Sequence, residues 1–239
     1  MRRLSLFSAP ASALVAGLSL FGADQAAAGP VTSTVATTPG TTYKAAALTG
    51  FATTGADMNG IEVTVFFAAG GSETATWSGG TSSAAGTGWS LSQPDDTFSN
   101  PWTLSNIGAG TISGFSINGL LGNTVFDIVT SPEGSPGSSD GAPFGSADAS
   151  DTGEITGADA TYSNELRIGG VFYGDLYVKL DVTFSGTGLT ASNSFSFVAD
   201  ADNASADRGG IQPVEVPAPG ALALFGLGLA GLGAVRRRR

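Results

Sequence analysis

The sequence predicts an all-β domain, an antiparallel sandwich of the jelly-roll type with roughly eight to ten strands, between two targeting segments. Apolar and polar residues alternate strictly over residues 176–184, which is typical of a half-buried antiparallel strand. Shorter runs of the same kind are separated by segments rich in Gly, Ser and Asn. No run with helical periodicity occurs over residues 29–212, so we expect this part of the chain to form strands alone.

The composition narrows the chemistry that this domain can perform. Between residues 29 and 219 four bases oppose nineteen carboxylates, a net charge of −15. Such an acidic surface disfavours nucleic acid, whose phosphates require a basic patch, and suits divalent cations. The whole chain has no histidine and no cysteine, which excludes Ser-His-Asp and Cys-His nucleophiles and the usual zinc sites.

The N-terminal residues 1–28 have the features of a secretory signal peptide. Arg2 and Arg3 form a basic start, and an apolar stretch follows over residues 4–21. Ala26 and Ala28 provide the small residues that signal peptidase requires, so we expect cleavage after Ala28. A permanent N-terminal membrane helix is the alternative, which the short, alanine-rich apolar stretch disfavours.

The strands of the body, residues 29–212, are predicted from alternation and from the turns between them. A threonine-rich segment, residues 30–40, is either a linker or a first edge strand. Two hairpins are expected, the second of which closes the domain. The expected strands are residues 43–51, 61–67, 73–78 with 87–92 as a hairpin, 111–118, 123–130, and 174–184 with 193–199 as a second hairpin.

Trp77 and Trp89 would lie near the ends of the first hairpin. Paired aromatic rings beside a loop can stack on a sugar, which makes these two residues candidate carbohydrate contacts, with Trp102 as a third. Packing in the core or at its rim is the alternative, and it is the one that we favour for bulky apolar rings in a sandwich.

Two acidic groups are candidate calcium ligands, because Ca²⁺ prefers several oxygen donors. The first lies in the longest segment expected to be irregular, residues 131–159, where a solvated acidic loop is the favoured alternative. The second follows the last expected strand, where Asx residues also favour turns. The first group is Asp140, Asp148, Asp151, Glu154 and Asp159, and the second is Asp200, Asp202 and Asn203.

The C-terminal segment, residues 213–239, has three parts. Pro217, Ala218 and Pro219 end a spacer, and an uncharged apolar run follows over residues 220–235. These sixteen residues would make a helix of about 24 Å, somewhat shorter than the ~30 Å hydrocarbon core. By the positive-inside rule the final bases would stay in the cytoplasm, which places the body outside. These bases are Arg236, Arg237, Arg238 and Arg239.

This segment resembles a PEP-CTERM sorting signal over about the last twenty-five residues. The family motif is usually Pro-Glu-Pro, whereas Pro217-Ala218-Pro219 stands here and Glu215 lies two residues earlier. The resemblance implies an exosortase-type membrane enzyme that cuts near the motif, in a Gram-negative, biofilm-forming bacterium. The protein would then be held briefly in the inner membrane before it reaches the cell surface or the exterior. An uncut tail anchor is the alternative.

Three functions are compatible with these observations. The first is a non-enzymatic surface or matrix protein, for which the resemblance implies a link to extracellular polysaccharide. The second is a carbohydrate-binding module that uses the tryptophans. The third is a glycosidase with two catalytic carboxylates, a chemistry that needs no histidine, although no pair of acids stands out in the sequence.

Overall fold

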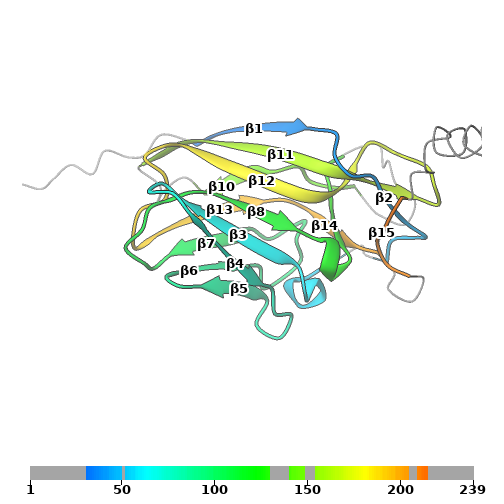
Figure 1. Cartoon of the computed structure of the whole chain (residues 1–239), viewed down its shortest axis with the longest axis horizontal. Coiled ribbons are helices and arrows are strands. Elements are labelled where there is room, and N and C mark those ends of the chain that lie inside the picture. The colour runs from blue at the N-terminus through cyan, green and yellow to red at the C-terminus, as the bar shows by residue number, and fades with distance from the viewer. Residues whose placement is uncertain (1–30, 50–51, 130–139, 149–153, 205–208, 215–239) are drawn as a thin grey trace, which may run out of the picture.

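Two β-sheets face each other in a sandwich-like arrangement (Figure 1). The computed structural model describes residues 31–49, 52–129, 140–148, 154–204 and 209–214. Within these ranges there is no α-helix, and the prediction of an all-β fold is confirmed. The expected signal peptide lies outside the described residues, as does the C-terminal segment after Val214.

The larger sheet has ten strands and the smaller has five. The larger runs in the order β15-β2-β11-β12-β8-β3-β4, with β1 on β11, β9 on the start of β12 and β14 on β9. The smaller runs β10-β13-β7-β6-β5. The bounds in the larger sheet are β1 Thr32–Thr37, β2 Tyr43–Ala45, β3 Glu62–Phe67, β4 Ser72–Thr76, β8 Ile112–Asn118, β9 Thr124–Asp127, β11 Ile155–Ile168, β12 Leu176–Gly186, β14 Ala201–Asn203 and β15 Gln212–Pro213. Those in the smaller sheet are β5 Ser83–Gly86, β6 Trp89–Ser92, β7 Trp102–Asn106, β10 Gly145–Asp148 and β13 Asn193–Val198, and two short 3-10 helices are η1 Gly55–Met58 and η2 Leu120–Gly122.

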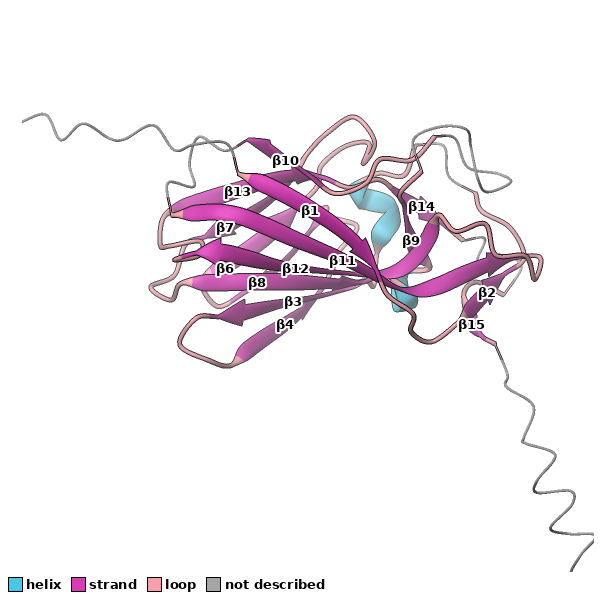
Figure 2. Ribbon diagram, turned by 90° about the horizontal axis from the view of Figure 1, so that it is seen from above, coloured by secondary structure: helices cyan, strands magenta, loops and turns pink. Residues whose placement is uncertain are grey.

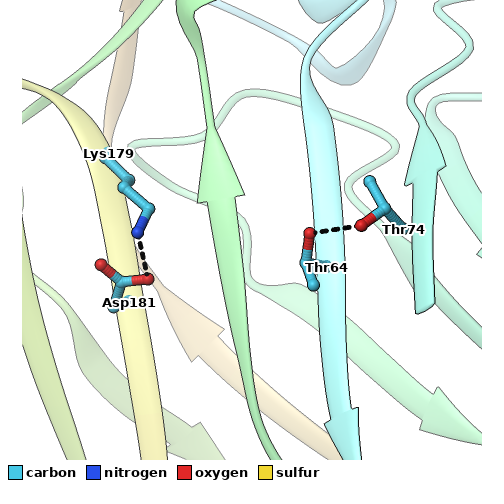
Figure 3. Close-up of polar contacts among 4 residues, drawn as sticks. All are labelled: Thr64, Thr74, Lys179 and Asp181. Carbon is cyan, nitrogen blue, oxygen red and sulfur yellow. Dashed lines mark hydrogen bonds and ion pairs between the residues drawn. The ribbon is translucent and has the colours of Figure 1, made fainter. Parts of the chain in front are cut away.

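The alternation along β12 is confirmed, because its even-numbered positions from Leu176 to Phe184 are all buried. On the other face, Lys179 and Asp181 are half-exposed and form an ion pair of 2.8 Å. Across β3 and β4 the hydroxyls of Thr64 and Thr74 lie 2.8 Å apart, as Figure 3 shows with the ion pair. From Leu180 to Phe184, period-two polarity therefore gives β12 an apolar face toward the other sheet and a polar face toward solvent.

Two cores hold the domain together. The larger fills the space between the sheets and is rich in aromatic rings, among them Trp102, Phe115 and Phe197. The smaller lies at the end of the molecule where β2, β14 and β15 meet, and contains Ala45, Leu48, Val125, Leu166, Ile168, Leu176, Val178, Ala204 and Ile211. The start of β12 is covered on both faces, since Tyr177 packs in the larger core and its neighbours in the smaller.

Both predicted hairpins are wrong. β4 pairs with β3 in the larger sheet, whereas β6 pairs in the smaller sheet with β5, a strand inside the expected loop. Likewise β13 pairs with β7 and β10, and has no pairing with β12. Alternation shows which face of a strand is buried, but a strand that crosses to the opposite sheet has the same alternation as one that returns beside its predecessor.

The strand count is also higher than expected, with fifteen strands among the described residues. The longest of them, β11, was not predicted, and it begins inside the segment expected to be irregular. β1 and β2 run parallel to β11, so the expectation of purely antiparallel pairing needs correction. β1 resolves the alternatives for the threonine-rich segment in favour of an edge strand.

The body extends slightly beyond its expected end at residue 212. β15 pairs with β2, and the Val214 N–H donates to the Thr42 carbonyl at 3.0 Å. In the part of the chain that the structure describes, no helix has the length and apolar character needed to cross a membrane.

Candidate functional site

The three tryptophans lie in the larger core, with exposures of 1% or less. Trp77 and Trp102 contact each other with ring centroids 5.4 Å apart, and Trp102 stacks on Phe197 at 5.9 Å. The indole N–H groups of Trp77 and Trp102 donate to the carbonyls of Gly55 at 2.7 Å and Ala199 at 2.9 Å.

The indole N–H of Trp89 instead donates to Glu73 at 2.9 Å. Since none of the three ring faces reaches the surface, the expected sugar platform at Trp77 and Trp89 is corrected to core packing. This was the alternative that the sequence favoured. The chain crosses between sheets at Trp77, so this ring faces inward instead of lying at the end of a hairpin.

Glu73 is a polar residue with a structural role that the sequence did not indicate. Its carboxylate accepts the Thr87 N–H at 2.8 Å and the Trp89 indole N–H, and so joins β4 of one sheet to the β5–β6 turn of the other. These two hydrogen bonds, with the Thr87 bond the stronger influence, lower the pKa of Glu73 below its ordinary value because they stabilise the charged form.

Four buried aspartates gather where β9, β12 and β14 meet. Asp127 ends β9, Asp175 precedes β12, Asp200 precedes β14 and Asp202 lies within it. The backbone brings the first three together, since Asp127 N–H donates to the Asp200 carbonyl and Ile128 N–H to the Asp175 carbonyl. Asp200 and Asp202 were predicted as site residues, whereas Asp127 and Asp175 were not, because their strands come from distant parts of the chain.

Asp200 is held by donors from the protein. Its Oδ1 accepts the Thr97 hydroxyl and the Ala201 N–H, both at 2.9 Å. Burial raises its pKa to about 6, since a charge is less stable away from water, and the carboxylates of Asp127 and Asp96 act in the same direction. The hydrogen bonds to Thr97 and Ala201 act in the opposite direction and only partly offset burial.

Asn203, the third expected calcium ligand of this group, has its own protein partner, because its Oδ1 accepts the Thr124 hydroxyl at 3.0 Å. The oxygens of Asp200 and Asn203 thus accept hydrogen bonds from protein groups, as is common for Asx residues in turns and at the start of strands. Among the described residues no group of three or more acidic side chains is placed to hold a metal ion. Calcium binding at Asp200, Asp202 and Asn203 stays a prediction.

The first acidic group does not form a single loop. Asp159 lies in β11, where its carboxylate accepts the Thr34 hydroxyl of β1. Asp148 ends β10, Asp140 lies five residues before β10, Glu154 directly precedes β11, and Asp151 falls outside the described residues. The described members are therefore distributed over β10, β11 and the segments before them, and strand pairing explains the position of Asp159.

The described residues thus define a β-sandwich domain with an aromatic core and a buried aspartate cluster. Beyond them, residues 215–239 match the family of the PEP-CTERM protein-sorting motif. The match confirms the resemblance, and such a motif supports an exported protein that is sorted by exosortase, a membrane enzyme. Comparisons with curated proteins and with solved structures gave no match.

The individual residues expected to act in targeting are outside the described ranges. These are Ala26 and Ala28 at the signal cleavage site, Pro217, Ala218 and Pro219 at the sorting motif, and Arg236, Arg237, Arg238 and Arg239 at the C-terminal end.

Proposed function

We propose that this chain is a non-enzymatic surface or matrix protein whose body is exported, anchored for a time by residues 220–235 and then separated from that anchor by exosortase near Pro217-Ala218-Pro219. The observation that carries the proposal is the PEP-CTERM match over residues 215–239. The signal-peptide features of residues 1–28 support the same route, because both signals direct the body across the inner membrane.

The position of the last strand supports cleavage at this point. Val214 is the last residue that the structure describes, and its N–H is bonded to Thr42 of the folded body. Pro217 follows three residues later, so a cut at the motif would leave β15 and its pairing with β2 on the body. The body would keep every strand after release, which suits a protein that works after processing.

The role of the body is proposed from its surface. A net charge of −15 over residues 29–219 favours a soluble, hydrated domain outside the cell. We assign it a matrix role linked to extracellular polysaccharide, as the resemblance implies, without a tryptophan platform, since those rings are buried.

Mass spectrometry of the protein from its native host tests the proposal. In wild-type cells we expect a chain that begins at Gly29 and ends near the motif, with any attached group. In cells without exosortase we expect residues 29–239 intact in the membrane fraction.

The double variant Pro217→Ala, Pro219→Ala should resemble the exosortase-deficient strain, while Pro94→Ala, an exposed proline of the body, should be processed normally. Intact residues 220–239 on the protein in exosortase-containing cells would contradict the proposal.

A further inference from the structure

One end of the domain combines exposed apolar side chains with the point where the chain leaves for the sorting segment. β2, β15 and the end of β11 lie together there in both views (Figures 1 and 2). The hairpin between β11 and β12 projects from the same end and presents Val171, Phe172 and Tyr173, which are 52%, 39% and 38% exposed. The other large exposed apolar residues among the described ones stand singly in the sequence.

The geometry of this tip is fixed. Ile168 and Val171 exchange two backbone hydrogen bonds of 3.0 Å across Gly169 and Gly170. Both glycines have positive φ, 59° and 90°, as a tight type I′ turn requires. The Gly169 N–H also donates to the Ala45 carbonyl of β2, so the turn is tied to the neighbouring strand. The turn therefore holds Val171 at the surface, and the exposed Phe172 and Tyr173 follow it directly.

Positive charge is found at the same end. Among the described residues the bases are Lys44, Arg167 and Lys179, and Lys179 is paired with Asp181. Lys44 and Arg167 are direct neighbours across β2 and β11, so their side chains share one face of the sheet. Lys44 also lines a pocket of about 280 Å³ with Gly169 and Gly170. Among the described residues, these two adjacent bases make this the end best suited to an anionic surface.

Chain length places this end next to the membrane while the tail is anchored. Gly220 is the sixth residue after Val214, so these two Cα atoms lie no more than about 20 Å apart. The opposite end is remote, because β1 begins beside Gly157 near the start of β11, and fourteen strand residues span about 46 Å.

We propose that Val171, Phe172 and Tyr173 enter the interface of the lipid bilayer, with Lys44 and Arg167 facing the headgroups, and so orient the body for cutting. Aromatic and apolar side chains next to basic ones favour this interfacial region. The inference rests on the proposed function, since it requires residues 220–235 to be anchored in the membrane.

The absence of cysteine allows single-cysteine labelling of the full mature chain, residues 29–239. Phe172→Cys reports on the tip, and Ile107→Cys is the matched control, 73% exposed and at the far end, where Ile112 bridges to Leu189 beyond β12. Leu229→Cys reports on the anchor itself. Each variant carries an environment-sensitive fluorophore and is reconstituted in vesicles of phosphatidylethanolamine and phosphatidylglycerol that contain a shallow nitroxide lipid.

We expect quenching and a blue shift at positions 172 and 229, and neither at 107. Tyr173→Cys should repeat the result at 172. Quenching at 229 with none at 172 or 173 would overturn the membrane contact and leave anchoring intact. No quenching at any position would overturn anchoring and the contact with it. Quenching at 172 that requires added exosortase would assign the tip to the enzyme and also overturn the proposal.

Discussion

Asp200 and Glu73 carry the same functional group in opposite surroundings. The first is buried beside other carboxylates, and the second accepts two N–H donors at the junction of the sheets. Burial stabilises the neutral form and the donors stabilise the charged form, so the two pKa values move apart. The two residues therefore give the body two opposite responses to pH.

For Asp200 we expect the free energy of unfolding to fall as the pH rises from about 4 to about 6. The folded state keeps the proton up to a pKa of about 6, whereas the unfolded chain releases it near the ordinary value of 3.8. Over this interval the folded state binds more protons, so its advantage is complete below the lower pKa and lost above the higher one. The effect is on the order of 3 kcal/mol.

Urea unfolding at pH 4 and pH 7 measures this effect by comparison of the wild type with Asp200→Asn, which keeps an acceptor for Thr97 and Ala201. The variant should lose less stability between the two pH values, by the amount stated above. Asp95→Asn, an exposed position, should behave as the wild type. Equal losses in the wild type and Asp200→Asn would refute the buried-carboxylate account.

Glu73 should respond in the opposite direction. Its folded-state pKa is lowered, so the stability it contributes is present above the unfolded value of about 4.5 and is lost as the pH falls through the folded-state pKa. Carbon-13 NMR of the carboxyl group should show titration below the ordinary value. In Trp89→Phe, which removes one donor, the midpoint should move back toward that value, and an unchanged midpoint would count against the indole bond.

At the scale of the element, Gly114 permits the pairing of β8 with β12. A Cβ there would lie 2.3 Å from the Val182 carbonyl oxygen and 3.2 Å from the Thr183 Cα, both backbone atoms that pairing holds in place. No side chain can move aside to relieve this contact.

Gly114→Ala should therefore destabilise the domain by about 2 kcal/mol or more. The matched control is Gly145→Ala in β10, where a Cβ meets nothing within 4 Å and φ is ordinary, so the change should be neutral or slightly stabilising. Denaturant midpoints of the two variants test the difference, and equal midpoints would show that β8 and β12 can separate at no cost.

Predictability from sequence also differs between elements. β12 was predicted because its buried positions hold large apolar residues without interruption. β11 was missed because Gly157, Ala158 and Ala160 are weak strand formers, and its stability comes from its pairing with β12 on one side and, on the other, with β1, which lies far away in the sequence. The Val171–Tyr173 tip depends on recognising β11, although Gly169-Gly170 before three apolar residues was an available signal.

The sites, like the strands, could be predicted where the signal is local in the sequence and could not where distant segments come together. The sorting motif is a continuous segment, so its recognition needed only the local sequence. The aspartate cluster is assembled from β9, β12 and β14, and half of it could not be predicted without the strand order. The position of the tryptophans likewise depended on which sheet each strand joins.

At the scale of the whole molecule, β15 closes the smaller core at the end where the tail begins. Ile211, 5% exposed, packs in this core, and its N–H donates to the Asn123 side chain at 3.0 Å. The body should therefore be indifferent to the loss of the residues after the motif but not to the loss of β15.

A variant that ends at Ala218 should melt at the same temperature as one that ends at Val214. A variant that ends at Gly210 should lose roughly 2–4 kcal/mol, since it gives up a buried isoleucine and the β15 pairing. Calorimetry of the three chains measures this series. An equal melting temperature for the chain that ends at Gly210 would show that β15 does not contribute to stability. A cut before β15 would then not destabilise the body.

The pairing of β15 also determines how the body responds to mechanical force. Tension on the tail acts first on the Val214–Thr42 hydrogen bond and then on β15, a strand of only two residues. The hydrogen bonds therefore break one after another and not all at once. Further extension then requires the Ile211 side chain to leave the smaller core. Force on the anchored body would thus first add a few residues to the extended linker, while the sandwich stays folded. β15 would pair with β2 again when the force ceased.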